Sequence, residues 1–284
     1  MEINAKTKLC GLLGNPVDHS LSPLIHNAAF QKLGLNFVYL AFKVEDLDGA
    51  VRGIRALGNL RGFSVTIPHK VAIIPFLDEV EQTARHIGSV NTIVVDGDRL
   101  TGYNTDASGA VLALEQAGVT LEGARILMLG SGGAARAIAF ALGAGKRVGA
   151  LSILGIDEKE RSALVKDLRD RTDLRAEEGP ITDDRLRAAI ARSDILIHCT
   201  PTGMHPKGDE TCVPARLLNP RLTVMDIVYN PRETRLLREA AAAGCRTIPG
   251  LEMFLNQAVG QFELWTGQTA PSDVMRAVLE SHFR

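Results

Sequence analysis

The sequence predicts an α/β protein of two lobes, the second of which contains a doubly wound parallel sheet. Three observations indicate this fold class. Short apolar runs alternate with helical patterns along most of the chain, as in βαβ units. One such run, residues 125–129, is followed directly by a glycine-rich turn that opens a helix. The length of 284 residues suits two domains or one large α/β unit.

The composition is that of an ordinary globular chain. Hydrophobic residues make up 45%, charged residues 23%, and the formal net charge is −1, which excludes disorder of the whole chain. The near-neutral balance gives no electrostatic footprint for a nucleic acid or an anionic membrane as partner. No stretch approaches the roughly 18 apolar residues of a membrane-spanning helix. Because no signal-peptide pattern is present either, we expect a cytoplasmic protein.

The cysteines and histidines do not show the spacing of a metal site. Cys10, Cys199, Cys212 and Cys245 are widely scattered and form no C-x-x-C pair. We therefore expect free thiols in a reducing compartment and no bound metal.

The first third of the chain predicts alternating strands and helices. Residues 8–14 form a short apolar run that ends in glycine, as a buried strand would. A helix begins at Ser22-Pro23, where the serine caps the helix and the proline occupies its first turn, and it ends before Gly34. The further expected elements are a strand at 36–42, a helix at 47–57, strands at 63–67 and 88–95, and a hairpin turn at Asp96-Gly97 into residues 100–102.

The rest of the chain continues the alternation and ends in helices. Residues 104–118 begin with the capping cluster Asn-Thr-Asp and end at Gly118, so they predict a helix able to link the two lobes. The elements expected after the 125–129 strand are a helix at 134–142, a strand at 148–154, a helix at 157–171, strands at 195–199 and 222–226, and helices from Gly250 to Trp265 and from Ser272 onward.

The segment from Gly130 to Ala135 fits the pattern G-x-G-x-x-G/A. Its first glycine allows a tight turn, Gly132 lets a pyrophosphate approach the backbone, and the small Ala135 lets helix and strand pack closely. The helix start offers free N–H groups and a positive dipole end to phosphates. Because the motif follows a strand and opens a helix, it predicts a dinucleotide site. The residues expected to bind there are Gly130, Ser131, Gly132, Gly133 and Ala134. The alternative is a glycine-rich turn without a ligand.

Asp157 follows the second strand of this lobe, where a side chain reads the ribose of a bound dinucleotide. A carboxylate there accepts hydrogen bonds from a 2′-hydroxyl and repels a 2′-phosphate, so Asp157 favours NAD over NADP. Asp157 also fits as the N-cap of the next helix, and the two roles are compatible.

Short polar clusters recur in the first lobe at strand ends and at loop-to-helix junctions, where side chains can converge on one cleft. The clusters are Ser20 with Ser22, Thr66 with Lys70, Asn91-Thr92, and Asn104-Thr105-Asp106. Hydroxyls, amides, one lysine and one carboxylate suit a small polyhydroxylated acid. Each cluster has a local alternative, with Ser22 and Asp106 as helix caps and Lys70 as a solvated side chain.

Eight segments in order resemble the shikimate dehydrogenase family, which includes the quinate/shikimate dehydrogenases. The segments are GNPVDHSLSPLIHNAAF, FSVTIPHK, GSVNTI, GYNTD, LGSGGAARA, CTPTGM, DIVYNP and GLEMFLNQA, and they span nearly the whole chain. The resemblance implies an NAD(P)-dependent oxidoreductase of aromatic amino acid biosynthesis that interconverts 3-dehydroshikimate and shikimate. It also implies a substrate-binding and catalytic domain at 1–106, completed by helices returning to it at 250–284, and a Rossmann-type NAD(P)-binding domain at 107–249.

The resemblance further implies roles for individual residues. Ser20 and Ser22 would hold the substrate carboxylate, and Lys70 and Asp106 match the catalytic pair of the family. The residues implied to bind the ring hydroxyls are Thr66, Asn91, Asp106 and Gln257, and Tyr229 would border the substrate. The residues implied to lie along the cofactor are Thr200, Gly203, Met204, Ile227, Gly250 and Met253.

The chemistry of alcohol oxidation fits these roles. The cofactor takes the hydride, and the protein must orient the ring and manage the hydroxyl proton. A lysine can move that proton if burial pulls its pKa toward neutrality, and it can instead stabilise developing charge on the oxygen. A nearby aspartate raises the pKa of a lysine, so Asp106 more plausibly orients Lys70 and binds a hydroxyl. The sequence leaves both roles of Lys70 open.

Two positions depart from the family pattern. NADP-dependent members carry Asn-Arg-Thr/Arg after the second Rossmann strand, whereas this chain has Leu154-Gly155-Ile156 followed by Asp157. The missing basic clamp favours NAD and the quinate/shikimate branch. Ser64 stands where many members have asparagine, and we expect no strong consequence.

Three functions therefore remain under comparison. The leading hypothesis is a shikimate dehydrogenase, and the alternative within the class is an NAD-dependent quinate dehydrogenase that makes 3-dehydroquinate. Quinate has one more hydroxyl than shikimate, so its pocket must supply one more polar partner. The third hypothesis, from another class of protein, is a ligand-binding homologue that lost catalysis, since fold alone does not imply function. The protein is expected to act as a monomer or a homodimer.

Overall fold

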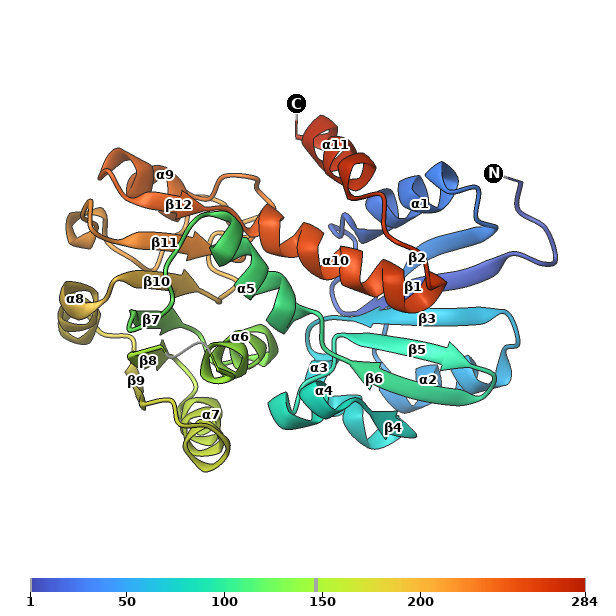
Figure 1. The fold of residues 1–284 in the computed structure, drawn as a ribbon, viewed down its shortest axis with the longest axis horizontal. Coiled ribbons are helices and arrows are strands. Elements are labelled where there is room, and N and C mark those ends of the chain that lie inside the picture. Colours follow the sequence, from blue (N-terminus) through green and yellow to red (C-terminus); the bar gives the residue numbers. More distant parts are fainter. Residues whose placement is uncertain (1, 146–147, 284) are drawn as a thin grey trace. The chain divides into compact units, whose positions relative to one another are not determined.

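The computed structural model describes residues 2–145 and 148–283, and it divides into two compact units (Figure 1). Unit 1 is formed by the chain up to Thr105 together with the chain from Gln257 onward. Unit 2 is the continuous segment Asp106–Asn256. The α/β class predicted from the alternating pattern is confirmed, because each unit is built from a sheet and flanking helices.

The sheet of unit 1 is mixed. Its strands run in the order β2-β1-β3-β5-β6-β4, with β1 parallel to both β2 and β3, and β5 antiparallel to both β3 and β6. The strand bounds are β1 Lys8–Gly14, β2 Phe37–Lys43, β3 Leu60–Val65, β4 Glu79–Val80, β5 Thr92–Asp96 and β6 Arg99–Tyr103. Because β1 and β3 are parallel, the loops that follow them leave from the same edge of the sheet.

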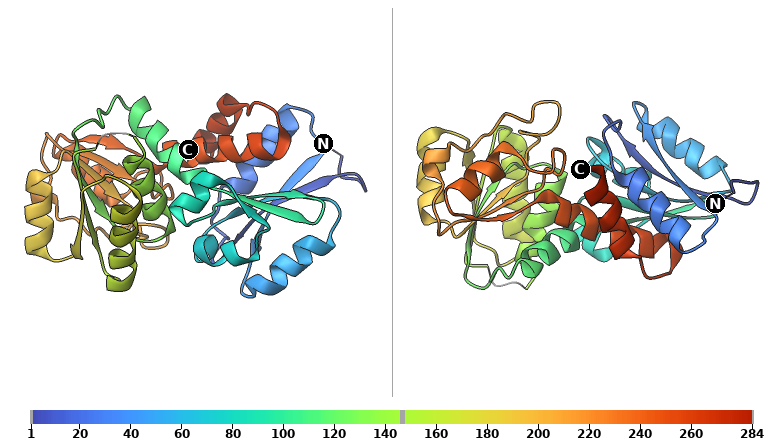
Figure 2. Two further views of the ribbon diagram at one scale, coloured as in Figure 1. Left: turned by 60° about the horizontal axis from the view of Figure 1, so that its bottom comes forward. Right: turned by 90° about the horizontal axis from the view of Figure 1, so that it is seen from above.

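Helices cover both faces of this sheet. Figure 2 shows the sheet between α2 on one face and α1, α11 and the second part of α10 on the other. The helix bounds are α1 Ser22–Lys32, α2 Leu47–Ala56, α3 His69–Ala72, η1 Ile74–Phe76, α4 Gln82–Ile87, α10 Gly250–Thr266 and α11 Ser272–His282. On the α2 face, Val51 and Ile54 pack with Phe63 and Ile93. On the other face, Phe30 stacks on Phe262 with ring centroids 5.3 Å apart.

The C-terminal helices return to unit 1, as the sequence predicted. Trp265 near the end of α10 is fully buried, and its indole N–H donates a hydrogen bond of 3.0 Å to the Ile93 carbonyl of β5. Arg61 of β3 donates from Nε to the Trp265 carbonyl at 2.7 Å. These contacts fix the second part of α10 against the central strands.

The sheet of unit 2 is parallel throughout its described strands. Its order is β12-β11-β10-β7-β8-β9, which corresponds to the 3-2-1-4-5-6 order of the Rossmann fold when it is counted from β9. The strand bounds are β7 Arg125–Leu129, β8 Ala150–Gly155, β9 Ala176–Pro180, β10 Ile195–His198, β11 Thr223–Asp226 and β12 Arg246–Ile248. The predicted doubly wound sheet is therefore confirmed.

Helices follow most strands of unit 2, as the βαβ rule requires. Their bounds are α5 Asp106–Gln116, α6 Gly133–Gly143, α7 Glu158–Arg171, α8 Asp183–Arg192, η2 Ala215–Leu217 and α9 Arg235–Ala242, and the first turns of α10 also belong to unit 2. Helices α5, α6 and α7 lie in a row beside the sheet (Figure 1). Among the helices of residues 2–145 and 148–283, none combines the length and the apolar character that a bilayer span needs.

Some local predictions were wrong. Ser22 does not cap α1: it is the first residue of the helix, Leu21 is the N-cap, and no side chain caps the helix. The backbone N–H of Ser22 instead donates to the Ser20 hydroxyl at 3.3 Å. The strand expected from residue 88 begins at Thr92, because Gly88 ends α4 with a φ of 71°.

Candidate functional site

Five of the predicted substrate residues gather at one edge of the sheet of unit 1. Ser20 and Ser22 follow β1, Thr66 and Lys70 follow β3, and Asn91 directly precedes the antiparallel β5. Backbone hydrogen bonds join these loops: Asn15 N–H donates to Ile67 O at 2.9 Å, and Val65 N–H donates to Asn91 O at 2.7 Å. The shared edge follows from the strand directions. The structure thus groups hydroxyls, an amide and a lysine that are far apart in the sequence.

Asn91 and Thr105 form the most connected part of this edge. The Asn91 amide nitrogen donates to Thr105 Oγ1 at 3.0 Å, and its amide oxygen accepts from the Thr105 backbone N–H at 2.8 Å. The same oxygen accepts from the Thr92 hydroxyl at 2.7 Å. All three side chains are buried. The orientation of the Asn91 amide is therefore fixed, with one N–H of its NH₂ group outside these contacts.

Gln257, the remaining predicted residue of unit 1, lies on α10 one turn before Gln261. Residues four apart lie on the same face of a helix, so the position of Gln261 locates Gln257. Gln261 donates from its amide nitrogen to Thr92 Oγ1 at 3.0 Å and to Asn91 O at 3.2 Å. Gln257 is also buried, with 8% of its surface exposed. The α10 face that bears Gln257 therefore packs beside Asn91.

Gln261, Ser64 and Tyr39 were not among the predicted site residues, and they form a buried chain of hydrogen bonds. The Tyr39 hydroxyl donates to Ser64 Oγ at 2.7 Å, and the Ser64 hydroxyl donates to Gln261 Oε1 at 2.7 Å. Ser64 was expected to have no strong consequence, and in the structure its hydroxyl links β2 to α10. The partners lie 25 and 197 residues away, a separation that no local pattern reveals.

Two predicted substrate residues, Asp106 and Tyr229, belong to unit 2. Asp106 is the first residue of α5 and is buried, with 5% of its surface exposed. Tyr229 lies in the loop after β11, and its ring stacks on Phe254 of α10 with centroids 4.2 Å apart. Met253 precedes Phe254 and is also buried. Lys70 of unit 1 is half-buried, so it keeps access to a ligand.

The glycine-rich turn has the geometry that a dinucleotide requires. Gly130 follows β7 with a φ of 107°, which disfavours any other residue, and a side chain there would lie 2.9 Å from the Cys199 carbonyl oxygen. Helix α6 begins at Gly133, and no side chain caps its first N–H groups. Gly132, its N-cap, faces open space where a Cβ would meet no atom within 4 Å. The uncapped helix start and the open glycine thus fit a pyrophosphate.

The other predicted cofactor residues lie around this turn. Thr200, Gly203 and Met204 belong to the loop after β10, and the Thr200 methyl group lies 3.1 Å from the Cβ position of Gly130. Ile227 follows β11, and a Cβ on Gly250 would lie 2.5 Å from its carbonyl group. The carboxyl ends of β7, β10 and β11 and the start of α10 therefore surround one region of unit 2, where dinucleotides bind in folds of this kind.

Acidic side chains lie at the start of α7, beyond the second strand of unit 2. Asp157 is the N-cap, and its carboxylate accepts from the Glu160 N–H at 2.9 Å. Glu160 in turn accepts a hydrogen bond of 3.3 Å from Ser131 of the glycine turn. Arg161 is buried and donates to Glu178 at 2.7 Å and to the Gly155 carbonyl at 2.8 Å. The hydrogen bond from Arg161 holds the pKa of Glu178 below its usual value. Arg161 is thus engaged inside the protein.

A buried histidine–aspartate pair below the glycine turn was not among the predicted site residues. His198 Nδ1 lies 2.9 Å from Asp226 Oδ1, and His198 Nε2 lies 2.5 Å from Thr200 Oγ1. From the sequence, the histidines were considered only as metal ligands, for which their spacing is unsuitable. The partners were hidden because His198 and Asp226 meet through the pairing of β10 with β11.

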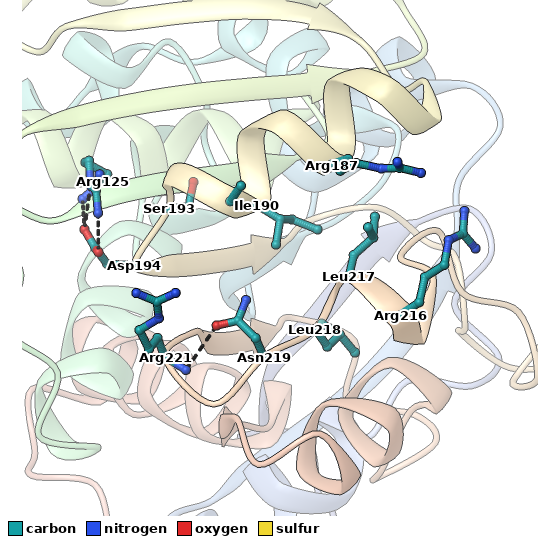
Figure 3. A pocket seen from close by; sticks show the side chains of 11 residues that line it. Arg125, Arg187, Ile190, Ser193, Asp194, Arg216, Leu217, Leu218, Asn219 and Arg221 are labelled. Atoms are coloured by element: carbon teal, nitrogen blue, oxygen red, sulfur yellow. Dashed lines mark hydrogen bonds and ion pairs between the residues drawn. The ribbon is translucent and has the colours of Figure 1, made fainter.

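The pocket in Figure 3, of about 690 Å³, lies elsewhere in unit 2 and contains none of the predicted residues. It is lined by residues at the amino-terminal edge of the sheet, where Arg125 begins β7 and pairs with Asp194 at 2.9 Å. Gly130 follows the opposite end of β7. This pocket is therefore separate from the glycine turn.

Unit 2 has the strand order and the glycine turn of the Rossmann class. Known proteins identify the family. Residues 12–93 match the family model described as "Shikimate dehydrogenase substrate binding domain", and residues 250–280 match "Shikimate 5'-dehydrogenase C-terminal domain". A shikimate dehydrogenase (NADP(+)) of Desulforamulus reducens is 45% identical over 282 residues, covering 98% of this chain and 96% of that protein. The chain belongs to the shikimate dehydrogenase family.

Two solved structures are similar over nearly their full length. The shikimate 5-dehydrogenase from Listeria monocytogenes, in complex with shikimate and NAD, is 41% identical with a TM-score of 0.88 and 98% of each chain covered. The quinate dehydrogenase from Corynebacterium glutamicum, in complex with NAD, is 31% identical with a TM-score of 0.88, covering 97% of this chain and 99% of that one. The fold of the family is thus shared by this chain, in agreement with the expectation from its motifs.

Proposed function

We propose that this protein is a shikimate dehydrogenase that catalyses the reversible, NAD(P)-dependent reduction of 3-dehydroshikimate to shikimate. One observation carries the proposal: within a chain of this family, Ser20, Ser22, Thr66, Lys70 and Asn91 share one edge of the unit 1 sheet. Such a set of hydroxyls, amide and lysine suits a polyhydroxylated acid. We assign substrate binding to the domain at 1–106, completed by 250–284, and cofactor binding to the domain at 107–249.

The substrate would be held by short polar side chains. Ser20 and Ser22 bind its carboxylate, and Thr66, Asn91 and Gln257 bind ring hydroxyls. The fixed amide of Asn91 supports this role, because a preorganised donor loses little entropy when the ligand binds. Tyr229, stacked on Phe254, would border the ring. Specificity for hydroxyl positions follows, since a ring lacking a hydroxyl would leave a buried polar group unpaired.

Lys70 and Asp106 would manage the proton of the reacting hydroxyl. When bound, the nicotinamide supplies the hydride chemistry. Lys70, half-buried after β3, accepts the hydroxyl proton during oxidation or stabilises the charge that develops on the oxygen. Asp106, buried at the start of α5, binds a hydroxyl and orients Lys70.

The dinucleotide would be held by backbone groups of unit 2. Gly130, Ser131, Gly132, Gly133 and Ala134 present the uncapped start of α6 to the pyrophosphate. Further contacts would come from Thr200, Gly203, Met204, Ile227, Gly250 and Met253. Since the net charge of the chain is −1, helix-end N–H groups and hydroxyls, rather than an excess of basic residues, hold both anions.

We further propose that NAD is the preferred cofactor. Asp157 and Glu160 add negative charge where a 2′-phosphate would bind, and Arg161 is engaged with Glu178 and Gly155. The Desulforamulus relative is named for NADP(+), whereas the Listeria and Corynebacterium structures contain NAD. The family therefore includes both cofactors, and the acids of this chain favour NAD. The same acids support NAD-dependent quinate oxidation as the second candidate function.

Binding and turnover, measured on one preparation, test the proposal. We expect the protein to bind NAD or NADP and to reduce it when shikimate is added. Cofactor binding with no oxidation of shikimate or quinate would contradict the proposal and support a ligand-binding homologue. Oxidation of quinate alone would support the second candidate. Lys70→Ala, which should bind cofactor normally, serves as the inactive control.

A further inference from the structure

His198 lies where the strands β7, β10 and β11 end, next to the loops that carry candidate cofactor residues. It is the last residue of β10, and it pairs in register with Leu129 of β7 and with Asp226 of β11. Leu129 directly precedes the glycine turn. The backbone N–H of Ile227 donates to the His198 carbonyl at 3.1 Å. Any change at His198 is therefore adjacent to Gly130, Thr200 and Ile227.

The imidazole of His198 connects a buried carboxylate to a hydroxyl at the glycine turn. Its exposed surface is 1%, and that of Asp226 is 0%. Asp226 accepts hydrogen bonds from Thr234 Oγ1 at 2.6 Å and from the Val228 N–H at 3.0 Å, in addition to its contact with His198 Nδ1. A carboxylate that only accepts requires the proton to be on Nδ1. The other nitrogen, Nε2, faces Thr200 Oγ1.

Thr200 Oγ1 receives a second contact, which limits what its hydroxyl can do. The Thr202 backbone N–H donates to this oxygen at 3.3 Å. A hydroxyl has two acceptor positions and one proton to donate. If Nε2 also carries a proton, it fills the second acceptor position, and the Thr200 hydroxyl must donate elsewhere. If Nε2 carries none, the Thr200 proton is used by the imidazole.

We propose that His198, as an imidazolium held by Asp226, is a positioning residue that makes the Thr200 hydroxyl a hydrogen-bond donor to the bound dinucleotide. This inference rests on the proposed cofactor site. The acceptor would be an oxygen atom of the bound dinucleotide, in a phosphate, ribose or carboxamide group. The Thr200 side chain is half-buried beside Gly130, so the hydroxyl lies at the glycine turn.

The surroundings of His198 favour the charged form. Burial alone would lower the pKa of His198, but the hydrogen bond to Asp226, the contact with the Cys212 side chain and the negative charge of Asp226 raise it to about 10. The ionisable groups that face the pair are Asp226 on β11, Cys212 in the loop before η2 and Cys199 beside it. On the β7 side, the paired residue is the apolar Leu129. The imidazolium is therefore the form present at neutral pH.

Nitrogen-15 NMR of histidine-labelled wild-type protein gives the first test. We expect His198 to show two protonated nitrogens at pH 7.5 and to lose one of them only at strongly alkaline pH. A neutral imidazole at pH 7.5 would overturn the proposal. This measurement needs no variant, so it holds even if substitution of His198 unfolds the protein.

The second test is the dinucleotide affinity of wild type and five variants, measured by titration at pH 7.5. Losing one hydrogen bond should raise Kd by about 3- to 10-fold in both Thr200→Val and His198→Asn. The double variant should show no further loss, whereas Thr200→Ser should bind normally and His86→Asn should match wild type. Additive losses, or normal binding by His198→Asn, would overturn the proposal. If wild type binds the dinucleotide but the variants give either of these contrary results, only the role of His198 is overturned and the proposed function stands. If wild type does not bind the dinucleotide, the role of His198 and the proposed function are both overturned.

Discussion

The side-chain amide of Asn91 holds Thr105 through both the Thr105 hydroxyl and the Thr105 backbone N–H, at 3.0 and 2.8 Å. Thr105 is the residue directly before Asp106, the carboxylate assigned to the reaction. Asn91 therefore has two consequences in this account. It offers a polar group to the substrate, and it fixes the backbone from which Asp106 starts α5.

Removal of the Thr105 hydroxyl should destabilise the protein. In Thr105→Val, the buried Asn91 amide loses its acceptor, so we expect the free energy of unfolding to fall by about 1–3 kcal/mol. Urea denaturation measures this change. Thr101→Val, on the neighbouring β6, is the matched control and should change stability by less than about 0.5 kcal/mol. Equal effects of the two substitutions would contradict the role of the Asn91–Thr105 contact.

Substitution of Lys70 should impair catalysis rather than cofactor binding. We expect Lys70→Ala to lower kcat by about 100-fold or more, the loss typical of a missing acid–base group. Steady-state kinetics with saturating shikimate, together with cofactor titration, separate the two effects. An unchanged kcat would remove Lys70 from the mechanism.

Two alanine substitutions in the glycine turn separate folding from ligand binding. Gly132→Ala places its methyl group in open space, so stability should stay unchanged while dinucleotide affinity falls at least about tenfold, because a pyrophosphate must approach that backbone. Gly130→Ala should also lower the free energy of unfolding, by about 2 kcal/mol or more, because φ is 107° and the Cys199 carbonyl blocks the methyl group. Normal affinity in Gly132→Ala would contradict the assignment of this turn.

The acids at the start of α7 should determine the choice of cofactor. Asp157→Ser keeps an N-cap oxygen and removes the charge, so we expect the ratio of kcat/KM for NADP to that for NAD to rise about tenfold without a loss of stability. Asp183→Ser, in the first turn of α8, is a control that removes an equivalent charge from the same unit. A constant ratio in Asp157→Ser would show that Asp157 acts only as a cap.

Acid should destabilise the protein partly through His26. Burial lowers the pKa of His26 from 6.5 to about 3, because neither ring nitrogen has, among the residues that the structure describes, a hydrogen-bond partner that would stabilise the charged form. The folded state therefore resists a proton that the unfolded chain accepts, and the stability from His26 is lost as the pH falls below about 6.5. Between pH 7 and pH 5, wild type should lose about 2 kcal/mol more than His26→Phe, as measured by urea denaturation. If the free energy of unfolding depended on pH in the same way in wild type and in His26→Phe, His26 would not contribute to the loss of stability in acid.

The sequence predicted the central elements well because their apolar residues are continuous. Strands β1 and β7 were identified with their observed bounds, and the turn after β7 carries a glycine spacing that is explicit in the chain. Strand β9 was missed because its residues, Ala-Glu-Glu-Gly-Pro, have no apolar pattern, and only pairing with β8 makes them a strand. The short helix α4 was missed, and Gly88, which ends it, was attributed to the following strand.

The site was predicted where chemistry and local spacing coincide, and it was missed where contacts join distant segments. Asp157 was expected both to cap α7 and to favour NAD; the cap is confirmed and the preference stays a prediction. The hydrogen bonds of Gln261 to Ser64 and of His198 to Asp226 depend on strand order and on the return of α10. Such contacts become visible only when the fold is known.

The central claim is tested most directly by kcat/KM for shikimate and quinate, each measured with NAD and with NADP. The account predicts turnover of shikimate, with kcat/KM highest for the pair of shikimate and NAD. A preference for NADP of tenfold or more would contradict the interpretation of Asp157. No turnover of shikimate with either cofactor, by a folded protein that binds dinucleotide, would contradict the account as a whole.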